Sequence, residues 1–184
     1  MSTDVKQAAV LLPILDTTAK SSTPYRLLDL NISESAEILF TIRTNTVEHH
    51  KGQISFPGGM FETGDADLKV TALRETEEEL GIDRKLIQIV SELEDAVTLS
   101  TGFRIKPYIG LVDAQTIFQP SSDEIAEILR VPLTHLLNPR HSEIETYLVG
   151  GANVQVRAYH YQGHRIWGAT ARILQVFLEK HLKF

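Results

Sequence analysis

Three glutamates in one short stretch have a spacing that suits divalent-metal chemistry. Glu75, Glu78 and Glu79 stand at i, i+3 and i+4, so in a helix their carboxylates share one face within about one turn. These like charges repel one another. A hard cation such as Mg²⁺, which prefers oxygen ligands and joins carboxylates to substrate phosphates, removes that repulsion. A solvated acidic helix face is the plainer alternative, and it explains the charges but none of the residues around them.

The surrounding residues add two features that a solvated face does not need. Arg74, four residues before Glu78, can orient that carboxylate through a fork-shaped pair of hydrogen bonds. The pair Gly58-Gly59 lets the backbone approach a ligand closely and leaves carbonyl groups free to meet a metal. Together these features predict a metal site between a glycine turn and an acidic helix.

The same stretch resembles the Nudix box of the Nudix hydrolase family. The box is a glycine followed by an acid, then arginine-glutamate, two adjacent glutamates and a closing glycine. The matching residues are Gly59, Asp65, Arg74-Glu75, Glu78-Glu79 and Gly81-Ile82. Asp65 replaces the usual glutamate and stands one residue further from the arginine, and Thr76 fills a position that is usually aliphatic. All the glutamates expected to hold metal are present, so the resemblance implies an active hydrolase.

Sequences on both sides of the box are similar to the coenzyme A pyrophosphatase branch of that family. The similar segments are 39–43, 52–59, 102–108, 124–133 and 166–172. Glu48 stands where the branch has arginine, and Thr44 replaces a serine or alanine. The resemblance implies cleavage of coenzyme A or acyl-CoA to a phosphopantetheine and adenosine 3′,5′-bisphosphate. Hydrolysis of ADP-ribose or a nucleoside-diphosphate sugar is the alternative that Glu48 favours, and a non-catalytic nucleotide-binding module is the third.

The resemblance also implies a role for each residue of the site. The ligands of Mg²⁺ or Mn²⁺ would be Glu75, Glu78, Glu79 and the carbonyl of Gly59. The catalytic residues would be Arg74, Glu75 and Glu124. Either Glu75 or Glu124 would serve as general base, and capping the segment that follows is the alternative role of Glu124.

Substrate contacts are expected from Arg43, Lys51, Phe56 and Gly58. Arg43 can bind a phosphate or pair with the acidic helix, and Phe56 can anchor the core instead of touching the ligand. Trp167, near the start of the last predicted helix, is expected to pack in the core rather than to stack on a base.

Length and composition narrow the class of protein. The 184 residues, 42% of them hydrophobic, fit a single domain spanning 1–184. The net charge of −6 gives no support to a nucleic-acid partner or an anionic membrane surface, and the absence of cysteine excludes disulfides and thiol chemistry. No run approaches the roughly 18 apolar residues of a spanning helix. The prediction is a cytoplasmic enzyme for a small-molecule nucleotide, with a homodimer as one open possibility.

The elements that must position the site follow from hydrophobic patterning. Strands are expected at 8–15, 36–43, 86–97 and 103–112, an apolar segment at 125–131, a hairpin at 147–161, and helices at 67–80, 134–137 and 169–182. Asp65 or Asp67 can cap the acidic helix, Gly81 closes it, and 56–59 is a turn. This order gives the α/β class with a mixed sheet. With the resemblance, it implies a Nudix-like α/β/α sandwich whose catalytic helix follows the FPGG loop.

Overall fold

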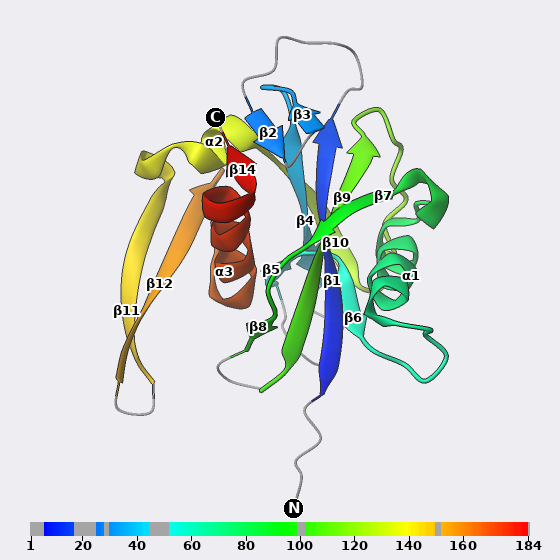
Figure 1. The fold of residues 1–184 in the computed structure, drawn as a ribbon, viewed down its shortest axis with the longest axis horizontal. Helices are drawn as coiled ribbons and strands as arrows, with labels where there is room; N and C mark the ends of the chain where they lie inside the picture. Colours follow the sequence, from blue (N-terminus) through cyan, green and yellow to red (C-terminus); the bar gives the residue numbers. More distant parts are fainter. Residues whose placement is uncertain are drawn as a thin grey trace, which may run out of the picture.

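A central mixed sheet organises the computed structural model (Figure 1), which describes residues 6–16, 25–27, 30–44, 52–98, 102–149 and 152–183. Its strands are β1 (Gln7–Asp16), β4 (Glu37–Arg43), β5 (Ile54–Ser55), β6 (Gly58–Met60), β7 (Gln88–Glu92), β8 (Ala96–Val97), β9 (Arg104–Asp113) and β10 (Ile125–Pro132). The strand order is β10-β4-β1-β9-β7, with β5, β6 and β8 paired to β4, β1 and β9.

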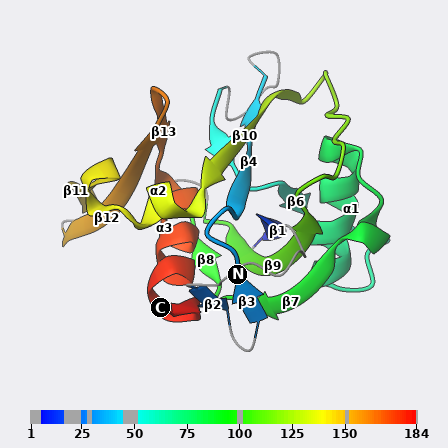
Figure 2. The ribbon, with the colours of Figure 1, turned by 90° about the horizontal axis from the view of Figure 1, so that it is seen from above.

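Strand β1 lies at the centre of this sheet because its continuous apolar run is buried on both faces. It runs parallel to β9 and antiparallel to β4. Alternate side chains point to opposite faces, so Leu11 belongs to one hydrophobic core and Leu12 to the other. The helices α1 (Leu68–Leu80) and α3 (Gly168–Val176) cover these two faces (Figures 1 and 2). The predicted α/β fold with a mixed central sheet is confirmed.

The acidic helix α1 has the predicted ends. The side chain of Asp67 accepts a hydrogen bond from the N–H of Val70 at 2.8 Å and caps the first turn. Gly81 ends the helix in the left-handed conformation, with φ 63°, and its N–H donates to the carbonyl of Glu77. Asp65, the other candidate cap, has a different role in the site.

The sequence predicts a turn at 56–59, but the two glycines of this segment lie in a strand. Gly58 and Gly59 belong to β6, which pairs antiparallel with Val10 and Ala9 of β1. The pairing is unusually close, since a Cβ at Gly58 would lie 2.3 Å from the carbonyl oxygen of Ala9, and its φ of +151° is open to glycine but rarely to other residues. The glycine pair therefore fixes the sheet edge that faces α1.

The remaining elements extend the fold beyond the central sheet. They are β2 (Tyr25–Leu27), β3 (Leu30–Ile32), the 3₁₀ turns η1 (Arg84–Leu86) and η2 (Pro139–His141), α2 (Leu133–Leu137), β11 (Ser142–Val149), β12 (Ala152–Tyr161), β13 (His164–Ile166), the π-helical η3 (Phe177–His181) and β14 (Leu182–Lys183). Strands β11, β12 and β13 form one small sheet, and β14, β2 and β3 form another. Among the described residues, no helix has the length and apolar character needed to cross a bilayer.

Three sequence predictions in this region need correction. The hairpin is confirmed, but its first strand begins at Ser142 rather than Tyr147. The last helix ends earlier than predicted, because Leu182 leaves it to pair with Leu27 in a sheet. Trp167 is not a core residue: it is 44% exposed, and the buried residue at that point is Ile166.

Candidate active site

Arg74 donates hydrogen bonds to three carboxylates on or beside the acidic face of α1. Its Nε and Nη2 donate to Oδ1 and Oδ2 of Asp65 at 3.0 and 3.1 Å. Its Nη1 donates to Glu75 at 3.0 Å and to Glu78 at 3.1 Å. The fork predicted for Glu78 is therefore formed with Asp65. Thr71, which the sequence analysis did not single out, also donates to Asp65, at 2.8 Å.

These charge-assisted bonds determine the protonation of the pair. The hydrogen bonds from Arg74 hold the pKa of Asp65 well below its ordinary range, and those to Asp65 raise the pKa of Arg74 further. Asp65 is buried, with its side chain 3% exposed. The aspartate in the box is thus a buried anchor that fixes the direction of Arg74.

Asp65→Asn is expected to lower the free energy of unfolding at pH 7 by about 2–3 kcal/mol, since the partly buried guanidinium of Arg74 loses its fork partner but keeps two glutamates. The folded pKa of Asp65 lies below the unfolded value near 4, so its stabilisation is fully present above that pH and is lost as the pH falls through the folded pKa. Parent and variant should therefore converge in stability on acidification.

Denaturant titrations between pH 7 and pH 3 measure this difference. Asp67→Asn is the matched control, because asparagine caps a helix as well as aspartate does. Equal stability of the two variants at pH 7 would contradict the role assigned to Asp65.

Glu79 is the least exposed of the three helix glutamates, with 3% of its side chain accessible. Its Oε2 accepts a hydrogen bond from the N–H of Gly58 at 3.3 Å, and its Oε1 lies 3.5 Å from Nη2 of Arg43. Burial raises its pKa to about 8 against the opposing effects of Arg43 and Gly58, and the carboxylates of Glu75 and Glu124 raise it further. Glu79 is a buried carboxylate with too little positive charge around it.

Glu75 lies against the backbone of Gly59. A Cβ built on Gly59 would stand 2.4 Å from Oε1 and 2.6 Å from Oε2 of Glu75. Burial also raises the pKa of Glu75, and the charge of Arg74 opposes this effect. Only glycine leaves room for this carboxylate in the middle of β6.

Gly59→Ala is expected to lower kcat by roughly 10- to 100-fold while the melting temperature changes little. The added methyl group meets the end of a flexible side chain, so the carboxylate of Glu75 moves and the backbone stays in place. The loss resembles that of misplacing a metal ligand. Kinetics at saturating metal together with a melting curve test this.

Gly58→Ala is the contrasting variant, because its methyl group would meet the backbone of Ala9 and Val10 at 2.3 and 2.6 Å. It should lose stability first. Unchanged kcat in Gly59→Ala would show that the position of Glu75 is unimportant.

Arg43 joins α1 to the loop that precedes β10. Its Nη2 lies 3.5 Å from Oε1 of Glu79 and 3.4 Å from Oε2 of Glu124. The loop is held in place by Thr44, whose N–H donates to the carbonyl of Glu124 at 2.9 Å and whose hydroxyl donates to the carbonyl of Asp123 at 3.0 Å. The ion pair of Arg43 with the acidic helix is confirmed, and Glu124 is brought to the same cluster.

The carboxylate oxygens of this cluster are the kind of ligand that a divalent cation such as Mg²⁺ prefers. Within the part of the chain that the structure describes, no three His, Asp or Glu side chains form a ready-made metal cage. Instead the acids are paired with Arg43 and Arg74. The raised pKa of the buried Glu79 and the room that Gly59 leaves for the carboxylate of Glu75 nevertheless both fit oxygen ligands of a divalent cation.

Two predicted substrate contacts need comment. Phe56 is 2% exposed and stacks on Phe40 with ring centroids 4.8 Å apart, so its place is in the core and the predicted contact is not supported. Lys51 lies outside the described residues. The other two predicted contacts, Gly58 and Arg43, both hydrogen-bond to the carboxylate of Glu79. Among the described groups, Nε of Arg43 is buried and has no hydrogen-bond partner.

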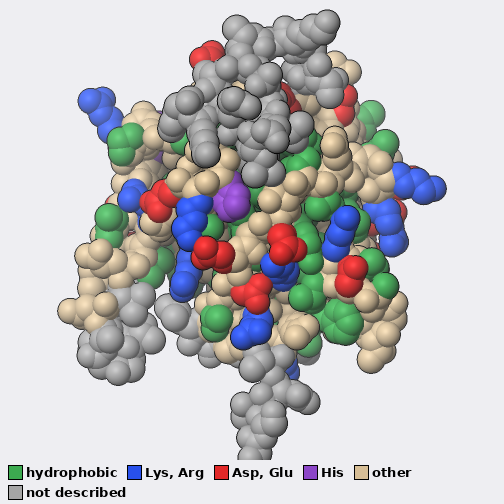
Figure 3. Space-filling view, in the orientation of Figure 1, with side chains coloured by type: hydrophobic (Ala, Val, Ile, Leu, Met, Phe, Trp, Pro, Cys, Tyr) green, Lys and Arg blue, Asp and Glu red, His purple; other side chains and the backbone are tan. Residues whose placement is uncertain are grey.

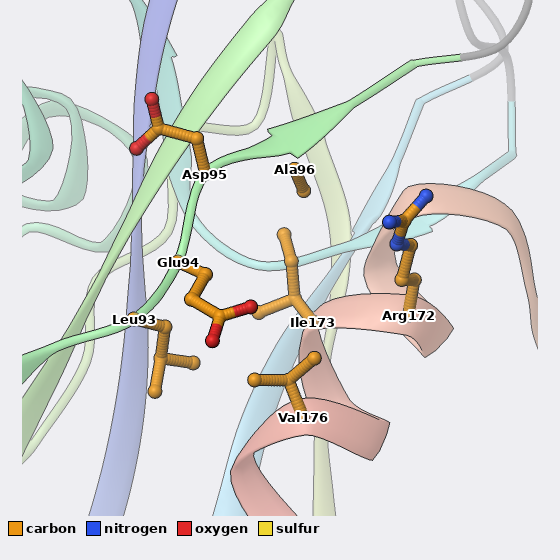
Figure 4. A pocket seen from close by; sticks show the side chains of 7 residues that line it. All are labelled: Leu93, Glu94, Asp95, Ala96, Arg172, Ile173 and Val176. Atoms are coloured by element: carbon orange, nitrogen blue, oxygen red, sulfur yellow. The ribbon is translucent and has the colours of Figure 1, made fainter.

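None of the residues that line the cavity in Figure 4 belongs to the acidic cluster of α1. The cavity in Figure 4 lies between β8 and α3 and has a volume of about 30 Å³, enough for a water molecule or two but not for a nucleotide. On the face seen in Figure 3, acidic and basic side chains alternate. Ion pairs also join β9 to the chain before it, between Lys106 and Glu92 and between Arg104 and Asp95.

Comparisons with known proteins agree with this geometry. A family profile described as NUDIX domain matches residues 30–149. The uncharacterized Nudix hydrolase NudL of Photorhabdus laumondii is 32% identical over 174 residues, which are 95% of this chain and 84% of the relative. The protein of the same description from Yersinia enterocolitica is 34% identical over 139 residues, 75% of this chain and 70% of the relative.

Solved structures share the fold. A MutT/nudix family protein from Enterococcus faecalis gives a TM-score of 0.60 at 10% identity, covering 97% of this chain, and this chain spans only 62% of that protein. An Ap4A hydrolase of C. elegans gives a TM-score of 0.51 at 19% identity, covering 71% of this chain and 82% of that one.

Proposed function

Because the chain belongs to the Nudix hydrolase family, we propose that its acidic cluster hydrolyses the pyrophosphate bond of coenzyme A or acyl-CoA. The products would be a phosphopantetheine and adenosine 3′,5′-bisphosphate. The observation that carries the hydrolytic part is the buried carboxylate of Glu79, whose pKa is raised to about 8 beside Glu75 and Glu124.

Metal ions of the Mg²⁺ or Mn²⁺ type would be held by Glu75, Glu78, Glu79 and the carbonyl of Gly59. When bound, such ions lower the pKa of a water molecule and neutralise charge on the phosphate oxygens. The protein supplies positioning, as for phosphoryl transfer generally. Asp65 fixes Arg74, and Arg74 in turn holds Glu75 and Glu78 in place.

Arg43 and Glu124 complete the proposed reaction centre. The side chain of Arg43 is 28% exposed and its Nε has no hydrogen-bond partner among the described groups, which supports its role as a substrate contact. Glu124 is half exposed and close to Glu79 through Arg43, so it can reach a water molecule and take its proton. Glu75 is the alternative base, since burial raises its pKa and it lies beside Gly59.

The choice of coenzyme A rests on segments outside the box, chiefly 39–43, 52–59 and 166–172. ADP-ribose or a nucleoside-diphosphate sugar is the second candidate, because Glu48 places an acid where an arginine would suit a third phosphate. A cytoplasmic location, one domain over 1–184 and a homodimer stay predictions of the sequence.

A substrate panel tests this proposal. Coenzyme A, 3′-dephospho-CoA, ADP-ribose, UDP-glucose and diadenosine polyphosphates are each assayed with Mg²⁺ and with Mn²⁺. We expect the highest kcat/KM for coenzyme A or an acyl-CoA, with adenosine 3′,5′-bisphosphate as product. A higher kcat/KM for ADP-ribose or UDP-glucose would replace the substrate assignment and leave the pyrophosphohydrolase intact.

A further inference from the structure

Trp167 is the only tryptophan of the sequence. It is one of the large hydrophobic residues that the structure leaves exposed. Ile166, the residue before it, is fully buried, whereas Trp167 is 44% exposed. Gly168 follows it in the chain. Gly168 has φ +66°, and no described atom lies within 4 Å of the position that its Cβ would take. The start of α3 is therefore uncrowded at Gly168, and the preceding indole is accessible for almost half of its surface.

The side chain of Trp167 is supported on one side. The guanidinium of Arg165 lies 5.6 Å from the centroid of the indole ring, within the range of a cation–π contact. Arg165 in turn donates hydrogen bonds to both carboxylate oxygens of Glu145. Residues of β11, β13 and the start of α3 thus fix the ring before any ligand arrives, which lowers the entropy cost of binding to it.

Trp167 is connected to the reaction centre by a short series of contacts. The hydroxyl of Thr170, one helical turn further along α3, donates to the carbonyl of Ile54 in β5 at 3.2 Å. Ile54 is the strand partner of Ile42 in β4, and the next residue of β4 is Arg43. Since paired strands lie ~4.8 Å apart, the start of α3 stands a few strand spacings from the Arg43 that contacts Glu79 and Glu124. Figure 1 shows β5 between α3 and the rest of the sheet.

We propose that Trp167 is the stacking platform for the aromatic base of the nucleotide whose diphosphate is cleaved at the acidic cluster. This inference rests on the proposed function and adds the place of the base to it. A flat indole accepts the face of an adenine, and stacking on one aromatic side chain changes affinity by roughly tenfold or more. Arg165 supports the indole from within the protein and does not itself contact the base.

The single tryptophan makes a direct experiment possible. The full-length protein is titrated with adenosine 3′,5′-bisphosphate and with ADP, and the indole fluorescence is recorded. Ribose 5-phosphate and inorganic pyrophosphate, which carry phosphate but no base, are the matched ligands. We expect saturable quenching by the two adenine nucleotides and none by the base-free compounds. Quenching by neither nucleotide would overturn the proposal.

Kinetics on variants provide the second readout. Trp167→Ala should raise KM for the best substrate of the panel by about tenfold while kcat stays within about twofold, and Trp167→Phe should restore most of the affinity. Leu86→Ala, at another exposed apolar residue, controls for loss of surface area and should match the parent. An unchanged KM in Trp167→Ala sinks the platform.

The two proposals fail in different ways. If coenzyme A is not hydrolysed but adenosine 3′,5′-bisphosphate still quenches the indole, the substrate assignment is wrong and the platform stands. If coenzyme A is hydrolysed with the same KM in Trp167→Ala, the function stands and the platform is wrong. If Trp167→Ala converts a dimer to a monomer in gel filtration and leaves KM unchanged, the ring is an interface residue, which also overturns the platform.

Discussion

In excess chelator the protein is expected to release no product from any pyrophosphate substrate, and added Mg²⁺ or Mn²⁺ should restore turnover. The reason is charge. The carboxylate of Glu124 raises the pKa of both Glu75 and Glu79, and a diphosphate adds further negative charge. Arg43 and Arg74 are engaged with the carboxylates, so they do not neutralise both the acids and the substrate. A divalent cation supplies the missing positive charge.

A thermal readout makes this prediction independent of turnover. A cation that binds only the folded chain at 100 times its Kd stabilises it by ~2.7 kcal/mol. For a chain of this length, each kcal/mol raises the melting temperature by about 2–4 °C. Mn²⁺ should therefore raise the melting temperature by several degrees, and chelator should reverse the rise. Full turnover in excess chelator would rule out the metal mechanism, and an unchanged melting temperature would remove the metal site.

The acidic helix α1 could be predicted from the sequence because its determinants are local. Gly81 marks the end of the helix by residue type, and two nearby aspartates, Asp65 and Asp67, limit its start to within one turn. The structure selects Asp67 as the cap. The buried strand β1 is also predictable, since a strand covered on both faces has an unbroken apolar sequence. The order of these elements then indicated a mixed sheet with helices on its faces.

The errors concern contacts that spacing within one element does not reveal. Gly58 and Gly59 look like a turn until β1 is placed beside them, because a glycine pair carries no sign of a strand partner. The fork of Arg74 goes to Asp65 in the preceding loop, and a helical spacing rule points only to Glu78. The residue type of Trp167 predicts a place in the core, whereas the structure leaves it 44% exposed at the start of α3.

Glu79→Gln is expected to lower kcat by ~10²-fold or more while the metal-free protein melts at the same temperature or slightly higher. Glutamine keeps the size of the side chain and can still accept the hydrogen bond from Gly58. It removes the charge that burial and the neighbouring carboxylates disfavour. The loss falls mainly in kcat, because a missing ligand misplaces the metal and its water but leaves other substrate contacts in place.

The pH dependence of stability distinguishes this role from that of a solvated acid. The folded pKa of Glu79, about 8, lies above the unfolded value near 4. Its protonation therefore stabilises the metal-free fold most at low pH, and this contribution is lost as the pH rises through 8. The parent should lose melting temperature between pH 6 and pH 9 more than Glu79→Gln does, when both are measured in chelator.

Glu77→Gln is the matched control on the same helix, because Glu77 pairs with Arg84 away from the cluster. It should retain the kcat of the parent. A solvated acidic face would give Glu79→Gln and Glu77→Gln similar, near-normal turnover at saturating metal. If kcat of Glu79→Gln stays within a few-fold of the parent, the assignment of Glu79 as a metal ligand is wrong, whatever the melting curves show.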